Sequence, residues 1–400
     1  MDKKRPIVYV TRDIERALGI DPGKGYVVIS NDTPQGRLAK GLYGEGVILI
    51  RDPRGELDTF DLLSLPEVAD VIENRKADLV VFQNTPRIER LAIERGWRLI
   101  NPLAALAQKI EEKVSQVSWL NDDGGLLPPH AVTLVKDISF DEKKFVLQFN
   151  HSHTGQGTFI IESASQLEEF KAKFPERECR IVDFIDGPVF TMNVVVGDSM
   201  LLGSTSYQIT GLAPFTDLPF STIGNDWGLP HTLLSNEELE KIDDIARTVG
   251  RRMKRDGWRG LFGIDVIQDE KTRDIYLLEI NARQPASTTF ESKLQRKKSS
   301  LSPTVFAAHL SAMINLNSET DEERIGALER ISDGAQIVQR VTSTPRIIDV
   351  SRLNDEGFFV TEYSNREHNK ELFRIQSIEG IMKGHNTLSE RGDLIRSCIL

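Results

Sequence analysis

Three polar residues alternate along the end of an apolar strand in the stretch YLLEINARQPAST. Glu279, Asn281 and Arg283 stand two positions apart from one another. Because successive side chains of a strand point to opposite faces, these three share one face. The opposite face is expected to hold the apolar residues Leu278, Ile280 and Ala282. The polar row therefore faces either solvent or a ligand, and not the core.

A carboxylate on the preceding strand is expected to join this row. The runs GIDVI and IYLLEIN flank the charged turn QDEKTRD, which is typical of a hairpin. Pairing about that turn puts Asp265 opposite or nearly opposite Glu279, where two like charges need a cation. Such oxygen ligands suit magnesium together with substrate phosphates, and Arg283 can fork onto a phosphate oxygen. The alternative is a surface hairpin with solvated charges.

Two further segments are candidates for binding a nucleotide. A loop of small and polar residues over 151–158 includes Gly155 and Gly157, whose backbone amides can cradle an anion. An ordinary hairpin turn explains the same residues. The segment IVDFIDG at 181–187 ends a strand in an extended piece whose backbone can pair with a base edge, with Phe184 packing nearby and Asp186 suited to a ribose hydroxyl. A strand that ends in an Asp-Gly turn fits this segment equally well.

The elements that position these residues begin with an α/β region. In the first hundred residues, apolar strand-like runs alternate with two helical patterns: PIVYV, YVVIS, GVILI, DLVVFQN and RLINP, with LPEVADVIEN and IERLAIERG between them. This order predicts a parallel sheet covered on both faces. No GxGxxG follows the first strand, so no dinucleotide site is expected there.

The rest of the chain mixes helices and strands. Helices are expected over 102–120, over 163–174 with a serine cap, over 237–257 and over 303–314, and short strands over the last 70 or so residues. Residues 203–231 are rich in Ser, Thr, Gly and Pro and are expected to form a long irregular loop. Such a loop is either a substrate wall or a surface excursion.

The composition narrows the class of protein. The chain has 400 residues, 39% of them apolar and 28% charged, with a formal net charge of −10. This balance favours a folded protein of two or three domains and disfavours nucleic acid as a partner. Two cysteines without metal-ligand spacing, and no run long enough to span a membrane, predict a cytoplasmic protein without a membrane partner. No convincing Ser/His/Asp or Cys/His set is present.

Taken in order, these motifs resemble the ATP-grasp superfamily, over roughly residues 100–315. The resemblance implies an α/β and α+β fold in three parts: an N-terminal pre-ATP-grasp parallel α/β domain (residues 1–105), an ATP-grasp fold of two α+β subdomains (106–315) and a small β-rich C-terminal module (316–400). It implies ATP and magnesium as cofactors, with two magnesium ions and with manganese as a possible substitute.

The resemblance also implies roles for individual residues. Asp265, Glu279 and Asn281 would ligate magnesium, and Arg283 would act on the transferring phosphoryl group. Lys113 would reach the nucleotide phosphates, with Lys109 as the alternative. The nucleotide-binding set would further include Gln148, Gly155, Gly157, Asp183, Phe184, Ile185 and Asp186, with backbone groups of Asp183 and Ile185 facing adenine.

The chain departs from the family pattern at two positions. Gln148 stands where relatives usually carry a phosphate-binding lysine, and it can donate a hydrogen bond but brings no charge. His151, His153 or Arg180 could compensate. Val189 replaces an acidic ribose ligand, which would leave that role to Asp186.

The activity implied is an ATP-dependent ligase that activates a carboxylate as an acyl phosphate, releases ADP and forms a C–N bond with an amine, such as an amino acid. A bicarbonate-activating enzyme of the carboxylase or carbamoyl-phosphate type is the first alternative, and a nucleotide-binding regulator without catalysis is the second. The partners implied are small-molecule carboxylate and amine substrates, and relatives suggest a homodimer through the first domain.

Overall fold

The computed structural model describes residues 5–150, 157–314 and 324–399, and side chains throughout except those of 324–327. Its first layer is a five-stranded sheet in the order β3-β2-β1-β4-β5, in which all neighbours are parallel, as predicted. The strands are β1 Ile7–Val10, β2 Tyr26–Asn31, β3 Val47–Ile50, β4 Asp78–Val81 and β5 Arg98–Leu99.

Helices cover both faces of this first sheet. They are α1 Pro34–Tyr43, α2 Thr59–Leu63, α3 Pro66–Arg75 and α4 Pro86–Arg95, with the 3-10 turns η1 Ile14–Ala17 and η2 Gly44–Gly46. The predicted helical patterns correspond to α3 and α4. Their apolar faces, for example Val68 and Ile88, pack with Val8 and Leu79 of the sheet in one core cluster. The other face packs against Phe306 of a later helix.

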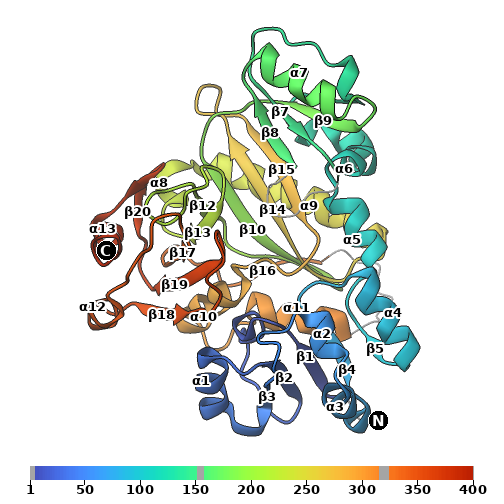
Figure 1. Ribbon diagram of the computed structural model, residues 1–400, viewed down its shortest axis with the longest axis vertical. Helices are drawn as coiled ribbons and strands as arrows, with labels where there is room; N and C mark the ends of the chain where they lie inside the picture. The colour runs from blue at the N-terminus through green and yellow to red at the C-terminus, as the bar shows by residue number, and fades with distance from the viewer. Residues whose placement is uncertain (1–4, 151–156, 315–323, 400) are drawn as a thin grey trace.

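A ten-stranded sheet forms the centre of the molecule (Figure 1). Its main order is β15-β14-β10-β12-β13-β17-β19-β18, and β11 and β16 extend it beside β10. The strands are β10 Val189–Val196, β11 Ser199–Leu202, β12 Ser206–Thr210, β13 Thr222–Asp226, β14 Gly260–Gln268, β15 Ile275–Asn281, β16 Arg324–Ala327, β17 Ala335–Arg340, β18 Phe359–Glu362 and β19 Glu371–Ser377.

Two helices cover opposite faces of the central sheet. Helix α9 (Asn236–Arg255) opens with a complete capping box at Ser235 and packs its apolar stripe against alternate residues such as Phe190 and Met192. Helix α11 (Val305–Ile314) packs against Val195 on the other face. Because α11 also packs on the first sheet, it joins the two sheets into one layered body.

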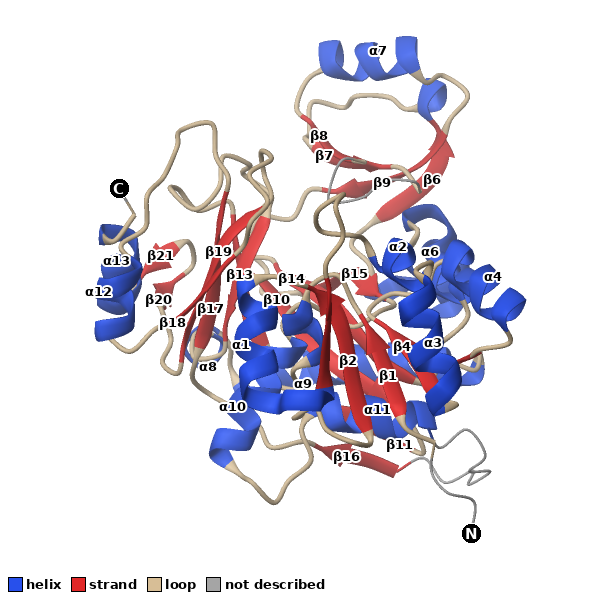
Figure 2. Cartoon of the chain, turned by 60° about the horizontal axis from the view of Figure 1, so that its bottom comes forward, coloured by secondary structure: helices blue, strands red, loops and turns tan. Residues whose placement is uncertain are grey.

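A four-stranded antiparallel sheet with helix α7 forms a separate lobe beside β14 and β15 (Figure 2). Its order is β6-β9-β7-β8. The elements are β6 His130–Leu134, β7 Phe145–Gln148, β8 Thr158–Ile161, β9 Glu178–Asp183 and α7 Ala164–Lys173, with the short turns η3 Asn121–Leu126 and η4 Val135–Asp137. Ser163 accepts a hydrogen bond from the backbone of Gln166, so the predicted serine cap of this helix is confirmed.

The helix predicted over 102–120 is interrupted. Helices α5 (Ala104–Glu111) and α6 (Lys113–Leu120) are separated by Glu112, whose backbone is extended at φ −68° and ψ 132°. The side chain of Asn150 compensates for the lost helical bonds, because its Oδ1 accepts from the backbone of Val114 at 2.6 Å. The break depends on a residue 36 positions away, so local periodicity could not reveal it.

The prediction of an irregular loop over 203–231 is wrong. This segment contains β12 and β13, which pair antiparallel inside the central sheet. Tyr207 and Ile209 are buried in the core, whereas Ser206 and Gln208 occupy the opposite face. The two strands are short and polar at alternate positions, and the turns around them are rich in Gly, Pro and Thr. The segment as a whole therefore has the composition of a loop.

The last part of the chain extends the central sheet. Strands β17, β19 and β18 pair in succession onto β13, so the sheet continues beyond residue 316. The remaining elements are α8 Pro230–Leu233, α10 Thr288–Lys298, α12 Val350–Asp355, α13 Glu390–Ser397, β20 Met382–Gly384 and β21 Thr387–Leu388. The domain boundaries at 105/106 and 315/316 stay predictions. None of the helices in the described residues combines the length and apolar character needed to cross a bilayer.

Candidate active site

The β14–β15 hairpin brings the predicted carboxylates together. Asp265 lies opposite Glu279 and Gly263 opposite Asn281, which confirms the expected register. A bulge follows Asp265, and Leu277 instead of Leu278 faces the core beside Ile280. The predicted alternation is therefore wrong at Leu278, because the bulge gives β15 one extra residue there.

Asp265 is held by neutral donors. The hydroxyl of Thr191 on β10 donates to its Oδ1 at 2.7 Å, and the amide Nδ2 of Asn281 donates to Oδ2 at 3.2 Å. Burial, followed by the charge of Glu279, raises the pKa of Asp265 to about 6. The negative charge of Asp265, the more buried of the two carboxylates, is therefore not balanced by a cation of its own.

Lys113 supplies one positive charge to the pair. Its Nζ lies 2.9 Å from Oε1 of Glu279. Burial alone would raise the pKa of Glu279, but Lys113 and Arg283 outweigh it, so the pKa is lowered. Because the helix is interrupted at Glu112, a new helix begins at Lys113. The position of the Lys113 backbone, and therefore of its side chain, depends on this break.

Arg283 reaches the same cluster from the end of β15. Its guanidinium forms a short ion pair with Glu111 of α5. Burial raises the pKa of Glu111 even though Arg283 opposes that effect. The break in the 102–120 helix thus puts Glu111 and Lys113, two residues apart, against Arg283 and Glu279 respectively.

Gln148 lies on the lobe sheet. It stands opposite Arg180 of β9, and the Nε of Arg180 donates to Oε1 of Gln148 at 2.9 Å. Gln148 also donates to the hydroxyl of Thr158 at 3.4 Å, the first residue of β8. Burial lowers the pKa of Arg180, and the negative charge of Glu279 opposes this effect.

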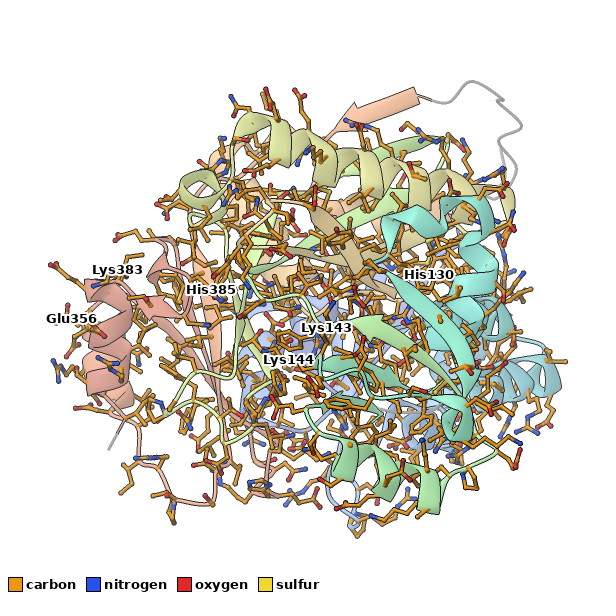
Figure 3. All side chains as sticks on the ribbon, turned by 90° about the horizontal axis from the view of Figure 1, so that it is seen from above. His130, Lys143, Lys144, Glu356, Lys383 and His385 are labelled. Atoms are coloured by element: carbon orange, nitrogen blue, oxygen red, sulfur yellow. The ribbon has the colours of Figure 1, made fainter. Side chains whose placement is uncertain are left out.

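The predicted base-binding segment connects β9 to β10. Asp183 ends β9, and Phe184, Ile185 and Asp186 follow it. The ammonium of Lys144 lies 3.8 Å from the centre of the Phe184 ring, and Figure 3 shows Lys144 next to Lys143 ahead of β7. The carbonyl of Asp186 accepts from the backbone of Glu270 at 3.0 Å.

Gly187 lets this segment approach the hairpin turn. Its φ is +155°, and an added Cβ would lie 2.0 Å from the carbonyl oxygen of Gln268. A residue with a side chain cannot occupy this position without displacing the turn. Residues 184–187 and the carboxylate hairpin are therefore fixed to each other by backbone contact.

The remaining predicted residues lie apart from the cluster or outside the described chain. Gly157 is buried, and its carbonyl accepts from the backbone of Phe149 at 2.9 Å. Gly155, His151 and His153 lie outside the described residues. Lys109 is exposed on α5 and makes no ion pair with described residues, whereas Lys113 lies in the cluster.

Sequence reasoning missed a row of polar side chains across the central sheet. The row begins beside Asp265 and continues on one face through successive strands: Thr191, Ser206, Gln208, Asn225, Gln336 and Gln376. Hydrogen bonds link neighbours, such as Gln208 to Thr191 at 3.2 Å and Asn225 to Ser206 at 3.1 Å. Polar residues at alternate positions of TMN and SYQIT were the available signal.

The donor set of the cluster fits a hard cation bound in part by its substrate. Among the described residues, no three His, Cys, Asp or Glu side chains are grouped to hold a metal. Two carboxylates and an amide are too few to enclose magnesium, which usually keeps further oxygen ligands from water and phosphates. An open cavity of about 450 Å³ lies between β8, α7 and Phe220, and no residue of the hairpin lines it.

Comparisons with known proteins identify a domain family within the chain. Residues 110–287 match the family described as ATP-grasp domain. No curated protein matches the chain significantly. Among solved structures, N5-carboxyaminoimidazole synthetase from Staphylococcus aureus, complexed with ADP, is 12% identical with a TM-score of 0.62, and the match covers 99% of this chain and 96% of that one.

Two other similar structures extend the comparison. The carboxyaminoimidazole ribonucleotide synthase from Aspergillus clavatus, complexed with ATP, is 15% identical with a TM-score of 0.63, and the match covers 99% of this chain and 97% of that one. Biotin carboxylase from Campylobacter jejuni is 12% identical with a TM-score of 0.64, covering 100% and 92%. At these identities the likeness concerns the fold. Together with the family match, it shows that this chain contains an ATP-grasp domain, over residues 110–287.

Proposed function

We propose that this protein is an ATP-dependent ligase that activates a carboxylate as an acyl phosphate and joins it to an amine, such as that of an amino acid. The observation that carries the proposal is the pairing of Asp265 with Glu279 inside a cluster that also holds Asn281, Lys113 and Arg283. Two adjacent carboxylates beside two cations suit the charge changes of phosphoryl transfer.

In the proposed reaction a substrate carboxylate oxygen attacks the γ-phosphorus of ATP, the bond to the bridging oxygen breaks, and ADP leaves. The amine nitrogen then attacks the acyl carbon, phosphate leaves, and the nitrogen loses a proton. Asp265, Glu279 and Asn281 would hold magnesium, or manganese, which neutralises charge on the phosphates when bound. Arg283 would stabilise the charge of the transferring phosphoryl group.

The nucleotide base would lie against the segment after β9. Among the described residues, no backbone hydrogen bond involves Phe184 or Ile185, so their N–H and C=O groups are available to an adenine edge. Asp186 is exposed and is proposed to bind the ribose. Lys113, which lies on Glu279, would also contact the phosphates. The polar row on the central sheet is proposed to face the other substrates.

Activation of bicarbonate is the second candidate. It is favoured by the biotin carboxylase and carboxyaminoimidazole synthetase structures, whose folds match nearly the whole of this chain, including the first sheet and the strands after residue 324. A regulator that binds ATP without turnover is the third, because Gln148 brings no charge to the lobe sheet. Cytoplasmic location and a homodimer stay predictions.

The deciding experiment is magnesium-dependent ADP release with pooled carboxylic acids and amino acids, with hydroxylamine as a trap. A hydroxamate formed together with ADP would establish the acyl phosphate and identify the carboxylate by mass. ADP release that depends on bicarbonate alone would favour the second candidate. ATP binding without ADP release under any of these conditions would contradict both enzymatic candidates.

A further inference from the structure

Arg180 is a buried cation without an anionic partner. It is 2% exposed on β9. Its Nε donates to Gln148 at 2.9 Å and its Nη1 to Gln116 at 3.1 Å, and both acceptors are neutral amide oxygens. Among the described residues no carboxylate lies within ion-pairing distance of it, unlike the buried Arg374, which pairs with Glu15. Burying an unpaired charge is costly, so the arrangement needs another explanation.

The guanidinium of Arg180 stays protonated, and its neighbours fix its orientation. Burial lowers its pKa to about 10, with Glu279 opposing, so the guanidinium stays protonated at neutral pH. Gln116 is itself anchored, because its Nε2 donates to the carbonyl of Ile110 at 3.0 Å. Two of the five guanidinium N–H groups are thus held by fixed amides. No hydrogen bond of Nη2 occurs among the described residues.

Arg180 lies between the lobe sheet and the carboxylate hairpin. It faces Gln148 directly across the β7–β9 pair, and it donates to Gln116, which follows Lys113 by one turn of α6. Lys113 in turn pairs with Glu279 of the hairpin. Lys113 already pairs with Glu279, and Arg283 with Glu111. Of the cations beside Glu279, Arg180 is therefore the one without a carboxylate partner in the described chain.

We propose that Arg180 is the cation that binds the nucleotide phosphates from the lobe sheet, with Gln148 and Gln116 holding its guanidinium in place. The inference rests on the proposed function, since it assumes that ATP binds between the lobe and the hairpin. It assigns a positioning role to Gln148, whose side chain accepts from Arg180. A planar guanidinium is well suited to phosphate oxygens, because it offers two parallel N–H groups.

The test compares binding of MgATP and of adenosine by calorimetry. In Arg180→Gln, MgATP affinity should fall roughly 10- to 100-fold, the range for a charged hydrogen bond. The affinity for adenosine, which has no phosphate, should be unchanged. In Arg180→Gln combined with Gln148→Lys, the charge moves to the facing strand, and most of the MgATP affinity should return. Lys136→Gln, an exposed cation of the same lobe, is the matched control and should bind both ligands normally.

Each outcome decides the inference. Unchanged MgATP affinity in Arg180→Gln overturns it and leaves the proposed function standing. An equal loss of MgATP and adenosine affinity assigns Arg180 a structural role and also overturns it. If Arg180→Gln does not fold, the double variant decides, because it should bind MgATP within a few-fold of the unsubstituted protein. Absence of MgATP binding in the unsubstituted protein would overturn both proposals.

Discussion

At the scale of single residues, the site depends on an excess of buried charge that its neighbours only partly balance. Asp265 is held by hydroxyl and amide donors, whereas Glu279 receives the ammonium of Lys113. The two carboxylates therefore differ: burial keeps the pKa of one high, at about 6, and cations keep the pKa of the other low. Such divergent environments are common at functional sites.

Replacing Glu279 with Gln should abolish most turnover and leave the fold nearly intact. The side chain is 40% exposed and pairs with a single lysine, so its loss should change the free energy of unfolding by no more than about 1 kcal/mol. Loss of an ionised ligand should lower kcat by about 100-fold or more. Turnover of ATP and a thermal melt measure the two effects.

Glu270→Gln is the matched control for this substitution, because Glu270 lies in the turn of the same hairpin and away from Asp265. It should retain full turnover. A Glu279→Gln variant with normal turnover would contradict the role assigned to Glu279.

At the scale of elements, breaks and bulges determine which side chains meet. The interruption at Glu112 divides one helical pattern into α5 and α6, and Asn150, two residues after the end of β7, caps the second. Glu111 and Lys113 then reach Arg283 and Glu279. In a continuous helix, residues two apart point in different directions.

Replacing Asn150 with Ala should therefore weaken both the fold and the site. Loss of a capping acceptor should destabilise the protein by about 1 kcal/mol. Fraying at the start of α6 should also displace Lys113 and raise KM for MgATP. Asn150→Asp retains the acceptor oxygen and should preserve both stability and KM. Equal effects of the two substitutions would refute the capping role.

A second element-scale prediction concerns Glu291 on α10. Burial raises its pKa to about 7, although the backbone N–H of Ser204 and the amide of Asn193 donate to it. The folded protein therefore binds this proton more tightly than the unfolded chain. The stability contributed by protonated Glu291 is complete below the unfolded pKa and is lost as pH rises through about 7.

Glu291→Gln should consequently gain stability relative to the unsubstituted protein as pH rises from 5 to 8, by at most about 3 kcal/mol. Urea unfolding at several pH values measures this difference. Glu240→Gln, an exposed substitution on α9, should show no such dependence. A pH-independent difference for Glu291→Gln would mean that Glu291 does not titrate as described.

At the scale of the whole molecule, the first sheet and the last strands meet through buried charge. Arg374 of β19 pairs with Glu15 of η1 and, at 2.6 Å, with Glu371. Gln376 also donates to Glu15 at 3.1 Å. These contacts connect residues about 360 positions apart and cover the far end of the polar row. An early and a late segment of the chain thus meet at the far end of the polar row.

Replacing Arg374 with Gln should destabilise the whole molecule by about 3–5 kcal/mol, because the buried Glu15 would lose its close guanidinium partner. The ammonium of Lys293, 3.6 Å away and half exposed, would then be the one cation left within ion-pairing distance of Glu15 among the described residues. Arg366→Gln removes a neighbouring pair with Glu362 whose side chains are both 55% exposed, and it should cost no more than about 1 kcal/mol. Denaturant unfolding compares the two variants. Similar losses would show that the buried pair contributes no more than the exposed one.

Features that depend on local pattern could be predicted from the amino-acid sequence alone. Alternation along YLLEINAR and a charged turn were enough to predict that Asp265 faces Glu279, because a hairpin pairs neighbours in the chain. The parallel first sheet followed from strands alternating with helices, and the order of motifs was enough to recognise an ATP-grasp domain.

Features that depend on distant partners could not be predicted, because they arise only when the chain has folded. The break at Glu112 needs Asn150, the bulge at Leu278 needs the facing strand, and the polar row needs five strands side by side. The environment of Arg180 could not be predicted for the same reason. Arg180 is buried on β9, and its two amide partners lie on two other elements, β7 and α6. Burial and pairing are properties of assembled layers, whereas periodicity is a property of the chain.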